Sequence, residues 1–192
     1  MVCHSKSLLK RSNTDADVIH GDIKPQNVLV FKDATSKTIV KVADFGYSTL
    51  TACEEAKVLL PKSRPWNAPE HHFGEFKVSE AKKTDVYSFG ILCFWVLFGY
   101  NLSHIPSHNT KSMAEVISFE ASTGPRTSLE QLKDADNLQH YASQLIDSIS
   151  LPRLNAEHRI YLKEFFSLTV PLNPKKRTSD LGKLVGLLSI ER

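Results

Sequence analysis

The sequence predicts an α+β fold that is mainly α-helical, with one short β-hairpin near the N-terminus. Two runs of β-branched and apolar residues, 28–31 and 39–42, flank the polar segment 32–37, a pattern typical of a hairpin. Beyond residue 69, apolar residues recur at helical spacing, and prolines separate the segments. The chain has 192 residues, of which 41% are hydrophobic, and this composition suits one globular domain.

The periodicity predicts five helices, at residues 84–98, 111–120, 137–148, 156–168 and 179–189. The last helix carries an apolar face, formed by Leu181, Leu184, Val185, Leu187 and Leu188. We expect this face to pack on the core, and a partner-binding helix is the alternative. The most apolar stretch, residues 86–100, is shorter than the roughly 20 residues that cross a bilayer. We therefore expect a buried helix and no membrane partner.

The charge of the chain argues against nucleic-acid binding. There are 24 Lys and Arg residues against 21 Asp and Glu residues, a formal net charge of +3 at pH 7. No long basic stripe with interleaved aromatic residues is present, so we expect no nucleic-acid partner. The short cluster of Lys175, Lys176 and Arg177 predicts a solvated loop with one structural arginine rather than a nuclear signal.

The cysteines indicate a reducing compartment. Cys3, Cys53 and Cys93 are odd in number and form no CxxC pair, so we expect neither a disulfide framework nor a thiolate zinc site. His71 and His72 are adjacent and cannot share the helical face of a two-histidine zinc site, so we assign them no metal. The polar N-terminus lacks the apolar core of a signal peptide. We expect a cytoplasmic protein, with the nucleus as the alternative.

The segment ahead of the first predicted strand concentrates groups suited to phosphoryl transfer. Asp22, Lys24 and Asn27 place a carboxylate, an ammonium and an amide within six residues. A carboxylate can orient an attacking hydroxyl, a lysine can neutralise phosphoryl charge, and an amide oxygen can bind a hard cation. Alternatively, Asp22 and Asn27 cap backbone groups in an ordinary turn.

A second acidic motif strengthens the phosphoryl-transfer interpretation. Asp44, Phe45 and Gly46 directly follow the predicted hairpin. The two strands should return Asp44 to the side of the first loop, where its carboxylate could hold magnesium on the phosphates.

Together these motifs resemble those of the eukaryotic protein kinase family. Residues 20–27 are similar to its catalytic loop and residues 44–46 to its magnesium loop. Residues 68–70 (Ala-Pro-Glu) resemble the motif closing its activation segment, residues 85–90 the start of its central buried helix, and Arg177 a late arginine. The resemblance implies a protein-kinase-like C-terminal lobe, in which the hairpin carries the catalytic and magnesium loops.

The resemblance implies a role for each matching residue. Asp22 would be the catalytic base, and Lys24 would act in catalysis and contact the phosphates of ATP. Asn27 and Asp44 would bind Mg²⁺ and, through it, the nucleotide. The implied cofactors are ATP and Mg²⁺, and the implied partner is a protein substrate presenting Ser or Thr, since Lys24 stands where the serine/threonine class has its lysine.

Other matching residues would support the site. Leu29 and Ala43 would line the floor of the adenine pocket, and His20 and Phe45 would stack inside the lobe. Ser63 is implied to support Asp22 and Lys24, whereas its alternative role is that of an ordinary loop serine.

Three further charged residues are implied to be structural. Glu70 and Arg177 would form a buried ion pair, against the alternative of two exposed charges. Asp85 would hold the backbone of the catalytic loop, although an aspartate that opens a helix is also a good cap.

Gly21 departs from the family pattern. Many kinases have an arginine there, whose guanidinium binds a phosphate on the activation segment. We therefore expect activity that does not depend on loop phosphorylation, although Ser48, Thr49 and Thr51 are available as acceptors.

A second departure concerns the residues before His20. They contain no glycine-rich loop, no strand lysine and no helical glutamate, so we expect residues 1–192 to be a partial kinase domain, the C-terminal lobe alone. Such a chain lacks the group that positions the phosphates from above and should be a poor catalyst by itself. Apolar surface around Val28, Leu29 and Ala43 would be open to a partner or to aggregation.

Three functions remain from this sequence. The first is a serine/threonine protein kinase, or a fragment of one, and the second is a catalytically inactive kinase-like module that binds or regulates a partner. The third is a small-molecule phosphotransferase, which also uses an HGD-like loop with a downstream asparagine. The motifs at residues 44–46 and 68–70 favour a protein kinase over this third class.

Overall fold

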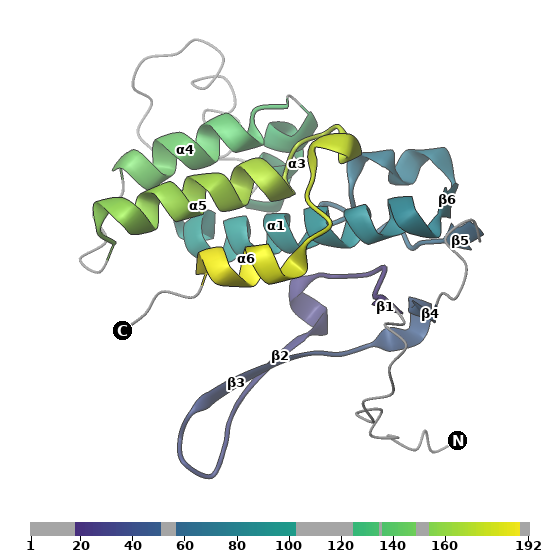
Figure 1. Ribbon diagram of the computed structural model, residues 1–192, viewed down its shortest axis with the longest axis horizontal. Helices are drawn as coiled ribbons and strands as arrows, with labels where there is room; N and C mark the ends of the chain where they lie inside the picture. The colour runs from purple at the N-terminus through teal and green to yellow at the C-terminus, as the bar shows by residue number, and fades with distance from the viewer. Residues whose placement is uncertain (1–17, 51–56, 103–124, 135, 149–153, 189–192) are drawn as a thin grey trace.

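The computed structural model describes residues 18–50, 57–102, 125–134, 136–148 and 154–188, and shows a mixed α+β fold (Figure 1). The helices in these ranges are α1 (Val78–Leu102), α3 (Pro125–Asp134), α4 (Leu138–Ser148), α5 (Ala156–Thr169) and α6 (Leu181–Leu188). The strands form antiparallel pairs: β1 (Val18–Ile19) with β4 (Thr49–Leu50), β2 (Val28–Lys32) with β3 (Thr38–Val42), and β5 (Lys57–Leu59) with β6 (Glu75–Lys77).

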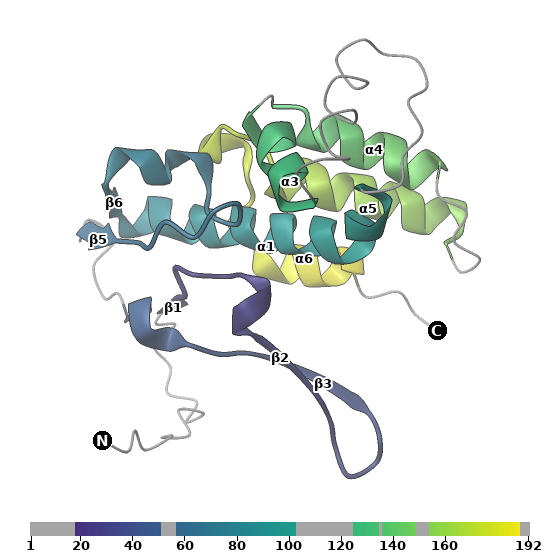
Figure 2. The same ribbon diagram turned by 180° about the vertical axis from the view of Figure 1, so that it is seen from behind.

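The predicted hairpin is confirmed as β2 and β3, which pair from Val28 opposite Val42 to Lys32 opposite Thr38. Its turn is closed by Asp33, whose side chain accepts hydrogen bonds from the backbone of Thr35 and Lys37. A hydrogen bond from the Thr35 hydroxyl, together with these backbone bonds, lowers the pKa of the Asp33 carboxyl. Figures 1 and 2 show the hairpin projecting away from the helices, and apolar side chains on both of its faces are exposed.

The helices form the body of the molecule, in which α5 packs against α1, α4 and α6. Phenylalanines of α1 and α5 fill the contact, and the rings of Phe94 and Phe166 meet edge to face at 5.9 Å. The helix backbones approach closely at Gly90, where a Cβ would lie 2.6 Å from Oγ1 of Thr169. A side chain at this position would therefore force α1 and α5 apart.

Helix α1 begins at Val78, six residues before the predicted start. Val78 and Ala81 are buried in a second apolar cluster with Ile19 of β1, Val58 of β5, Leu60 just after β5, and Phe76 of β6. This burial explains the early start. Asp85 consequently lies inside α1, so its expected alternative role as a helix cap is wrong.

The other helices agree with the prediction to differing degrees. Helices α4, α5 and α6 confirm the segments predicted at 137–148, 156–168 and 179–189, whereas the expected helix at 111–120 lies outside the described residues. Helix α3 was not predicted, because its first residue, Pro125, is also typical of a boundary; proline suits the first turn of a helix. In the part of the chain that the structure describes, no helix combines the length and apolarity needed to span a bilayer.

Candidate active site

The backbone of the segment 20–27 is held by Asp85 of α1. Its carboxylate accepts hydrogen bonds from the backbone N–H groups of His20 (2.7 Å) and Gly21 (2.9 Å). Burial raises the pKa of this carboxyl, and the two N–H bonds oppose the shift. The implied role of Asp85 as the anchor of this loop is therefore confirmed.

Gly21 has a backbone conformation that favours glycine. Its φ angle is +80°, and a Cβ at this position would lie 2.9 Å from a methyl group of Leu60. Any side chain here would combine backbone strain with a steric contact. The glycine in place of the family's arginine thus has a local structural cause.

The ring of His20 connects this loop to the segment after the hairpin. Its Nε2 atom lies 3.0 Å from the carbonyl oxygen of Ala43. Its ring packs against that of Phe45 at a tilt of 58°, with the ring centroids 5.0 Å apart. The Ala43 N–H donates to the carbonyl of Asn27 at 2.8 Å. Asp44 therefore lies between two neighbours in the chain that both contact the loop, and the expected placement of its carboxylate over the phosphates stays a prediction.

Asp22, Lys24 and Asn27 meet in one cluster. The Lys24 ammonium lies 2.6 Å from Oδ2 of Asp22, and the Asn27 amide donates to the backbone carbonyl of Asp22 at 2.8 Å. The Asp22 side chain is 4% exposed and that of Lys24 is 24% exposed. Oδ1 of Asp22 is buried and has no hydrogen-bond partner among the described residues.

Ser63 joins the cluster from a distant part of the sequence. Its hydroxyl accepts a hydrogen bond from the Lys24 ammonium at 3.2 Å, so the expected contact with Lys24 is confirmed. The Ser63 carbonyl accepts from the backbone N–H groups of Trp66 and Asn67, which closes a turn over residues 63–67. Lys24 thus bridges Asp22 and this turn.

The atoms available for a cation are those of Asp44, Asn27 and Asp22. Asp44 is exposed, with a left-handed backbone (φ 63°) and a side chain that accepts from the Gly46 N–H at 3.3 Å. The nitrogen of the Asn27 amide is used by Asp22, which leaves the amide oxygen for a cation. Carboxylate and amide oxygens suit Mg²⁺, which commonly takes one or two protein ligands and fills its other positions with phosphate and water. The residues present therefore fit this metal.

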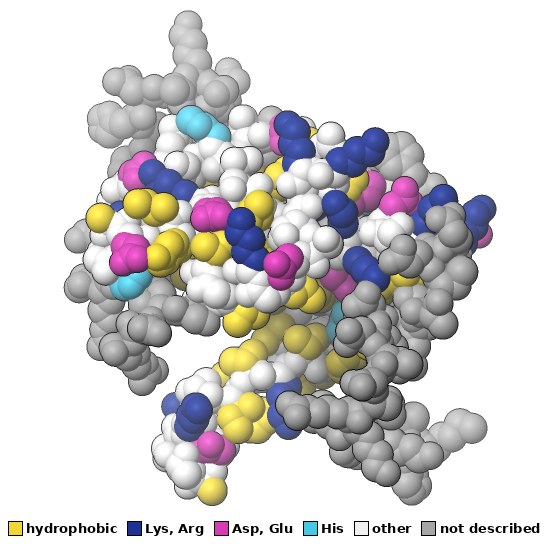
Figure 3. All heavy atoms as spheres, in the orientation of Figure 1, with side chains coloured by type: hydrophobic (Ala, Val, Ile, Leu, Met, Phe, Trp, Pro, Cys, Tyr) yellow, Lys and Arg dark blue, Asp and Glu magenta, His cyan; other side chains and the backbone are white. Residues whose placement is uncertain are grey.

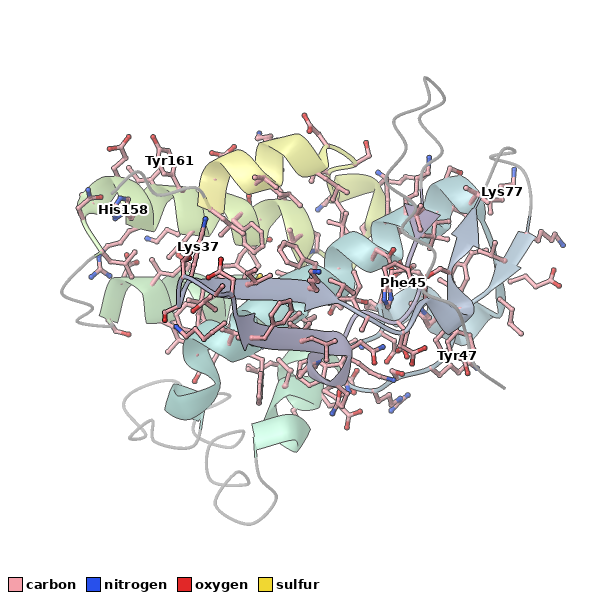
Figure 4. All side chains as sticks on the ribbon, turned by 90° about the horizontal axis from the view of Figure 1, so that it is seen from below. Lys37, Phe45, Tyr47, Lys77, His158 and Tyr161 are labelled. Carbon is pink, nitrogen blue, oxygen red and sulfur yellow. The ribbon has the colours of Figure 1, made fainter. Side chains whose placement is uncertain are left out.

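The residues expected at the adenine pocket lie at the base of the hairpin. Leu29 of β2 is 51% exposed, and Ala43 follows β3 directly. In Figure 4 the hairpin runs from its base near Phe45 to Lys37 at its tip. Figure 3 shows hydrophobic side chains along this protruding part of the molecule. The expectation of open apolar surface near Leu29 is confirmed.

An apolar pocket of about 380 Å³ lies on another side of the loop. It is lined by His20 and Phe45, by residues of α1, and by Leu181, Leu184 and Val185 of α6. None of the predicted site residues Asp22, Lys24, Asn27 and Asp44 lines it.

The ion pair implied between Glu70 and Arg177 is confirmed. The two terminal nitrogens of the Arg177 guanidinium donate to the two carboxylate oxygens of Glu70, at 2.5 and 2.9 Å. The Arg177 side chain is fully buried. Its remaining N–H groups donate to the carbonyls of Pro171, Leu172 and Lys83. This pair joins the end of the activation-segment region to the loop before α6.

Lys133, a buried lysine of α3, was not predicted from the sequence as a site residue. Its ammonium donates to the carbonyls of Pro65 (3.1 Å) and Asn67, inside the turn that carries Ser63. The available signal was weak: Lys133 stands four residues after Leu129, on the apolar face of a helix that the sequence did not predict.

Comparison with known sequences identifies related proteins. The family model of the protein kinase domain matches residues 4–178. A putative serine/threonine-protein kinase/receptor of Acanthamoeba polyphaga mimivirus is 45% identical over 86 residues, and a probable serine/threonine-protein kinase of Dictyostelium discoideum is 36% identical over 95 residues. A megakaryocyte-associated tyrosine-protein kinase of Rattus norvegicus is 34% identical over 103 residues.

These alignments cover limited parts of both sequences. They include 44%, 48% and 52% of this chain, and 5%, 6% and 20% of the respective relatives. The chain therefore spans a small fraction of the length of the relatives it matches, which include serine/threonine and tyrosine kinases.

Proposed function

Because this chain belongs to the protein kinase domain family, we propose that it transfers the γ-phosphoryl group of ATP to a serine or threonine hydroxyl of a protein substrate. The observation that carries the proposal is the buried, unpartnered Oδ1 atom of Asp22 beside the Lys24 ammonium. A buried carboxylate oxygen without a donor is costly, and a substrate hydroxyl would supply that donor.

Asp22 acts as the base in this proposal. The substrate hydroxyl donates a hydrogen bond to its carboxylate, which orients the oxygen toward the γ-phosphorus. As the new P–O bond forms, the carboxylate receives the proton, the bond from the γ-phosphorus to the β,γ-bridging oxygen breaks, and ADP leaves. Asn27 fixes the Asp22 backbone through the hydrogen bond to its carbonyl, and the anchored loop limits the movement of the carboxylate. Positioning and electrostatic stabilisation account for most of the catalysis in this class of reaction.

Lys24 contributes positive charge to the transferred group. Its ammonium is held between Asp22 and Ser63, and its side chain is partly exposed, so it can reach a phosphate from this position. The contact with Ser63 supports the serine/threonine class, because Ser63 stands where many kinases of that class have a threonine that bonds the lysine of the catalytic loop.

Asn27 and Asp44 hold Mg²⁺ in this proposal, and the bound cation neutralises charge on the phosphates of ATP. Leu29 and Ala43 provide the apolar floor for the adenine. We propose that the described residues form the C-terminal lobe of the kinase domain, which supplies the base, the magnesium ligands and the surface for the protein substrate.

Transfer of radiolabelled phosphate from ATP to a generic acceptor such as myelin basic protein tests the proposal. We expect slow, Mg²⁺-dependent transfer by the chain, since a C-terminal lobe alone should be a poor catalyst. We expect a further loss of about 10²- to 10⁴-fold in Asp22→Asn, because the base is removed while its shape is kept. Asp44→Asn should weaken both transfer and Mg²⁺-dependent ATP binding. Asp147→Asn is the matched control, since Asp147 is an exposed carboxylate of α4 paired with Lys163.

Equal transfer by the chain and by Asp22→Asn would contradict the assignment of the base. Mg²⁺-dependent ATP binding that survives in Asp44→Asn would contradict the assignment of the metal ligand. Transfer to tyrosine rather than to serine or threonine, detected by phosphoamino-acid analysis, would correct the substrate class.

A second candidate function, a kinase-like module that binds a protein partner without catalysis, is favoured by the hairpin. Val30 and Val40 are 66% and 60% exposed, on one face of the paired strands, and Leu29 and Phe31 are exposed on the other. A two-stranded sheet with both faces open is marginal in water, so this surface suits an apolar protein partner. Light scattering after gel filtration tests whether a second copy of the chain is that partner: a monodisperse monomer that does not change with Val30→Thr and Val40→Thr would contradict self-association through this surface.

A further inference from the structure

Lys133 occupies an unusual position for a lysine. It lies in the last turn of α3 and is 6% exposed, although lysine side chains are almost never fully buried unless they are paired. Its ammonium donates to two backbone carbonyls of the turn, those of Pro65 and Asn67, and lies 5.6 Å from the centre of the Tyr87 ring. All of these contacts are formed with other elements of the fold.

The contacts replace the water that the buried ammonium loses. An unpaired buried charge is strongly unfavourable, whereas charge-assisted hydrogen bonds to carbonyls and an aromatic face each offset part of that cost. The charged and titratable groups that face Lys133 are Glu130 and Asp134 on its own helix, Arg64 in the turn, Glu70 and His71 in the segment 69–73, and Tyr87 in α1.

The turn that Lys133 holds is the one that carries Ser63. On one side of this turn, the Ser63 hydroxyl contacts Lys24 of the catalytic loop. On the other side, the carbonyls of Pro65 and Asn67 contact Lys133. Inside the turn, the Ser63 carbonyl accepts from the N–H groups of Trp66 and Asn67. The turn is thus fixed between two lysines from distant parts of the sequence.

We propose that Lys133 is a positioning residue, which holds the turn of residues 63–67 in place so that Ser63 and the adjoining substrate surface keep their register with Lys24 and Asp22. Its effect on a protein substrate rests on the proposed function. Its effect on the turn does not, because the contacts exist in the chain without ATP or substrate. Helix α3 would in this way influence the site without contacting it.

The contacts of Lys133 with the turn should depend on pH. Burial lowers the pKa of Lys133 from 10.5 to about 8, with Arg64 acting in the same direction and nearby carboxylates opposing it. As the pH rises through this value the ammonium becomes an amine, and its hydrogen bonds to the turn lose their charge assistance. The turn should therefore loosen near pH 8. The folded protein should simultaneously gain stability between pH 8 and 10.5, since the unfolded chain then binds more protons than the folded chain.

Tryptophan fluorescence tests the proposal without any assay of activity. The chain has two tryptophans, so Trp95→Phe leaves Trp66, inside the turn, as the sole indole. We expect its emission to change with a midpoint near pH 8 in this background, and to show no such midpoint when Lys133→Met is added. Lys133→Arg, which stays charged, should also remove the midpoint. The exposed Lys175→Met is the matched control and should leave the midpoint unchanged.

Each outcome decides the proposal. A constant Trp66 emission between pH 7 and 9, or a midpoint that persists in Lys133→Met, overturns it. If circular dichroism shows that Lys133→Met does not fold, a midpoint that persists in Lys133→Arg overturns the proposal instead. These results do not depend on phosphotransfer, so failure of the proposed function would be seen separately, as absent transfer in the unsubstituted chain.

Substrate kinetics test the link to the reaction. We expect Lys133→Met to raise KM for myelin basic protein by about tenfold or more, because the loss of one charge-assisted hydrogen bond corresponds to about that change in an equilibrium constant. The KM for ATP should be unchanged. An unchanged KM for the protein substrate, or a change in the KM for ATP as large as or larger than that for the protein substrate, would overturn the link, because a general structural defect would affect both.

Discussion

Two ion pairs in this protein have similar partners but different surroundings. Arg177 and Glu70 form a two-point contact, and each remaining part of the guanidinium meets a backbone carbonyl or the Tyr87 ring at 4.5 Å. Lys24 and Asp22 make one short contact of 2.6 Å, with a lysine that is 24% exposed and a carboxylate oxygen that is buried without a partner. Within the described residues, the groups of the Arg177–Glu70 pair all have partners, whereas Oδ1 of Asp22 in the other pair has none. We call the second pair open for this reason.

This difference distinguishes a charged pair that stabilises the fold from a charged pair that can bind a ligand. A buried pair whose groups are all satisfied stabilises one arrangement of the chain, and removal of either partner leaves a charge without compensation. An unsatisfied buried oxygen instead marks a place where a ligand can supply the missing donor. The first pair should therefore dominate stability, and the second should dominate activity.

The largest effect on stability is expected from Arg177→Met. The substitution leaves Glu70 and the carbonyls of Pro171, Leu172 and Lys83 without their common donor. We expect the free energy of unfolding to fall by about 3 to 5 kcal/mol. Urea unfolding followed by circular dichroism measures it.

Lys183→Met serves as the control for this measurement. Lys183 pairs with Glu164 at the surface, where both side chains are more than 40% exposed. Such pairs contribute about 0 to 1 kcal/mol. A loss below about 1 kcal/mol in Arg177→Met would show that the buried pair is no more important for stability than the surface pair.

A smaller loss of stability is expected from Gly21→Ala, in the backbone of the open pair. The new Cβ would occupy a left-handed conformation and approach Leu60, which should cost about 1 to 3 kcal/mol. The same substitution at Gly186 of α6, where a Cβ would meet nothing within 4 Å, should stabilise the protein by about 0.5 to 1 kcal/mol. Thermal unfolding should therefore separate the two variants in opposite directions, and a shift of the same sign in both would refute the local explanation for Gly21.

Much of the fold could be predicted from the sequence, because its strongest patterns are local. The runs of β-branched and apolar residues at 28–31 and 39–42 predicted the hairpin, and helical spacing predicted α4, α5 and α6. The early start of α1 depends on burial of Val78 by distant strands, and α3 begins at a proline, so neither followed from local periodicity.

The candidate site shows the same limit. The catalytic-loop motif predicted the cluster of Asp22, Lys24 and Asn27, and the order of the motifs predicted the pairing of Glu70 with Arg177. The sequence could not show which oxygen of Asp22 is unpartnered or that Lys133 supports the turn, because both depend on contacts between residues far apart in the chain.

The smallest effect on stability, and the sharpest test of the comparison, is expected from Asp22→Asn. The substitution removes the attraction to Lys24, but it also removes a buried charged oxygen that has no donor among the described residues. These two changes oppose one another, and Lys24 keeps its contact with Ser63 and with solvent. We therefore expect the free energy of unfolding to change by less than about 1 kcal/mol, well below the effect of Arg177→Met. Urea unfolding under the same conditions checks this. A loss as large as that of Arg177→Met would mean that Asp22 holds the fold together, and the distinction between a structural and a functional pair would then fail.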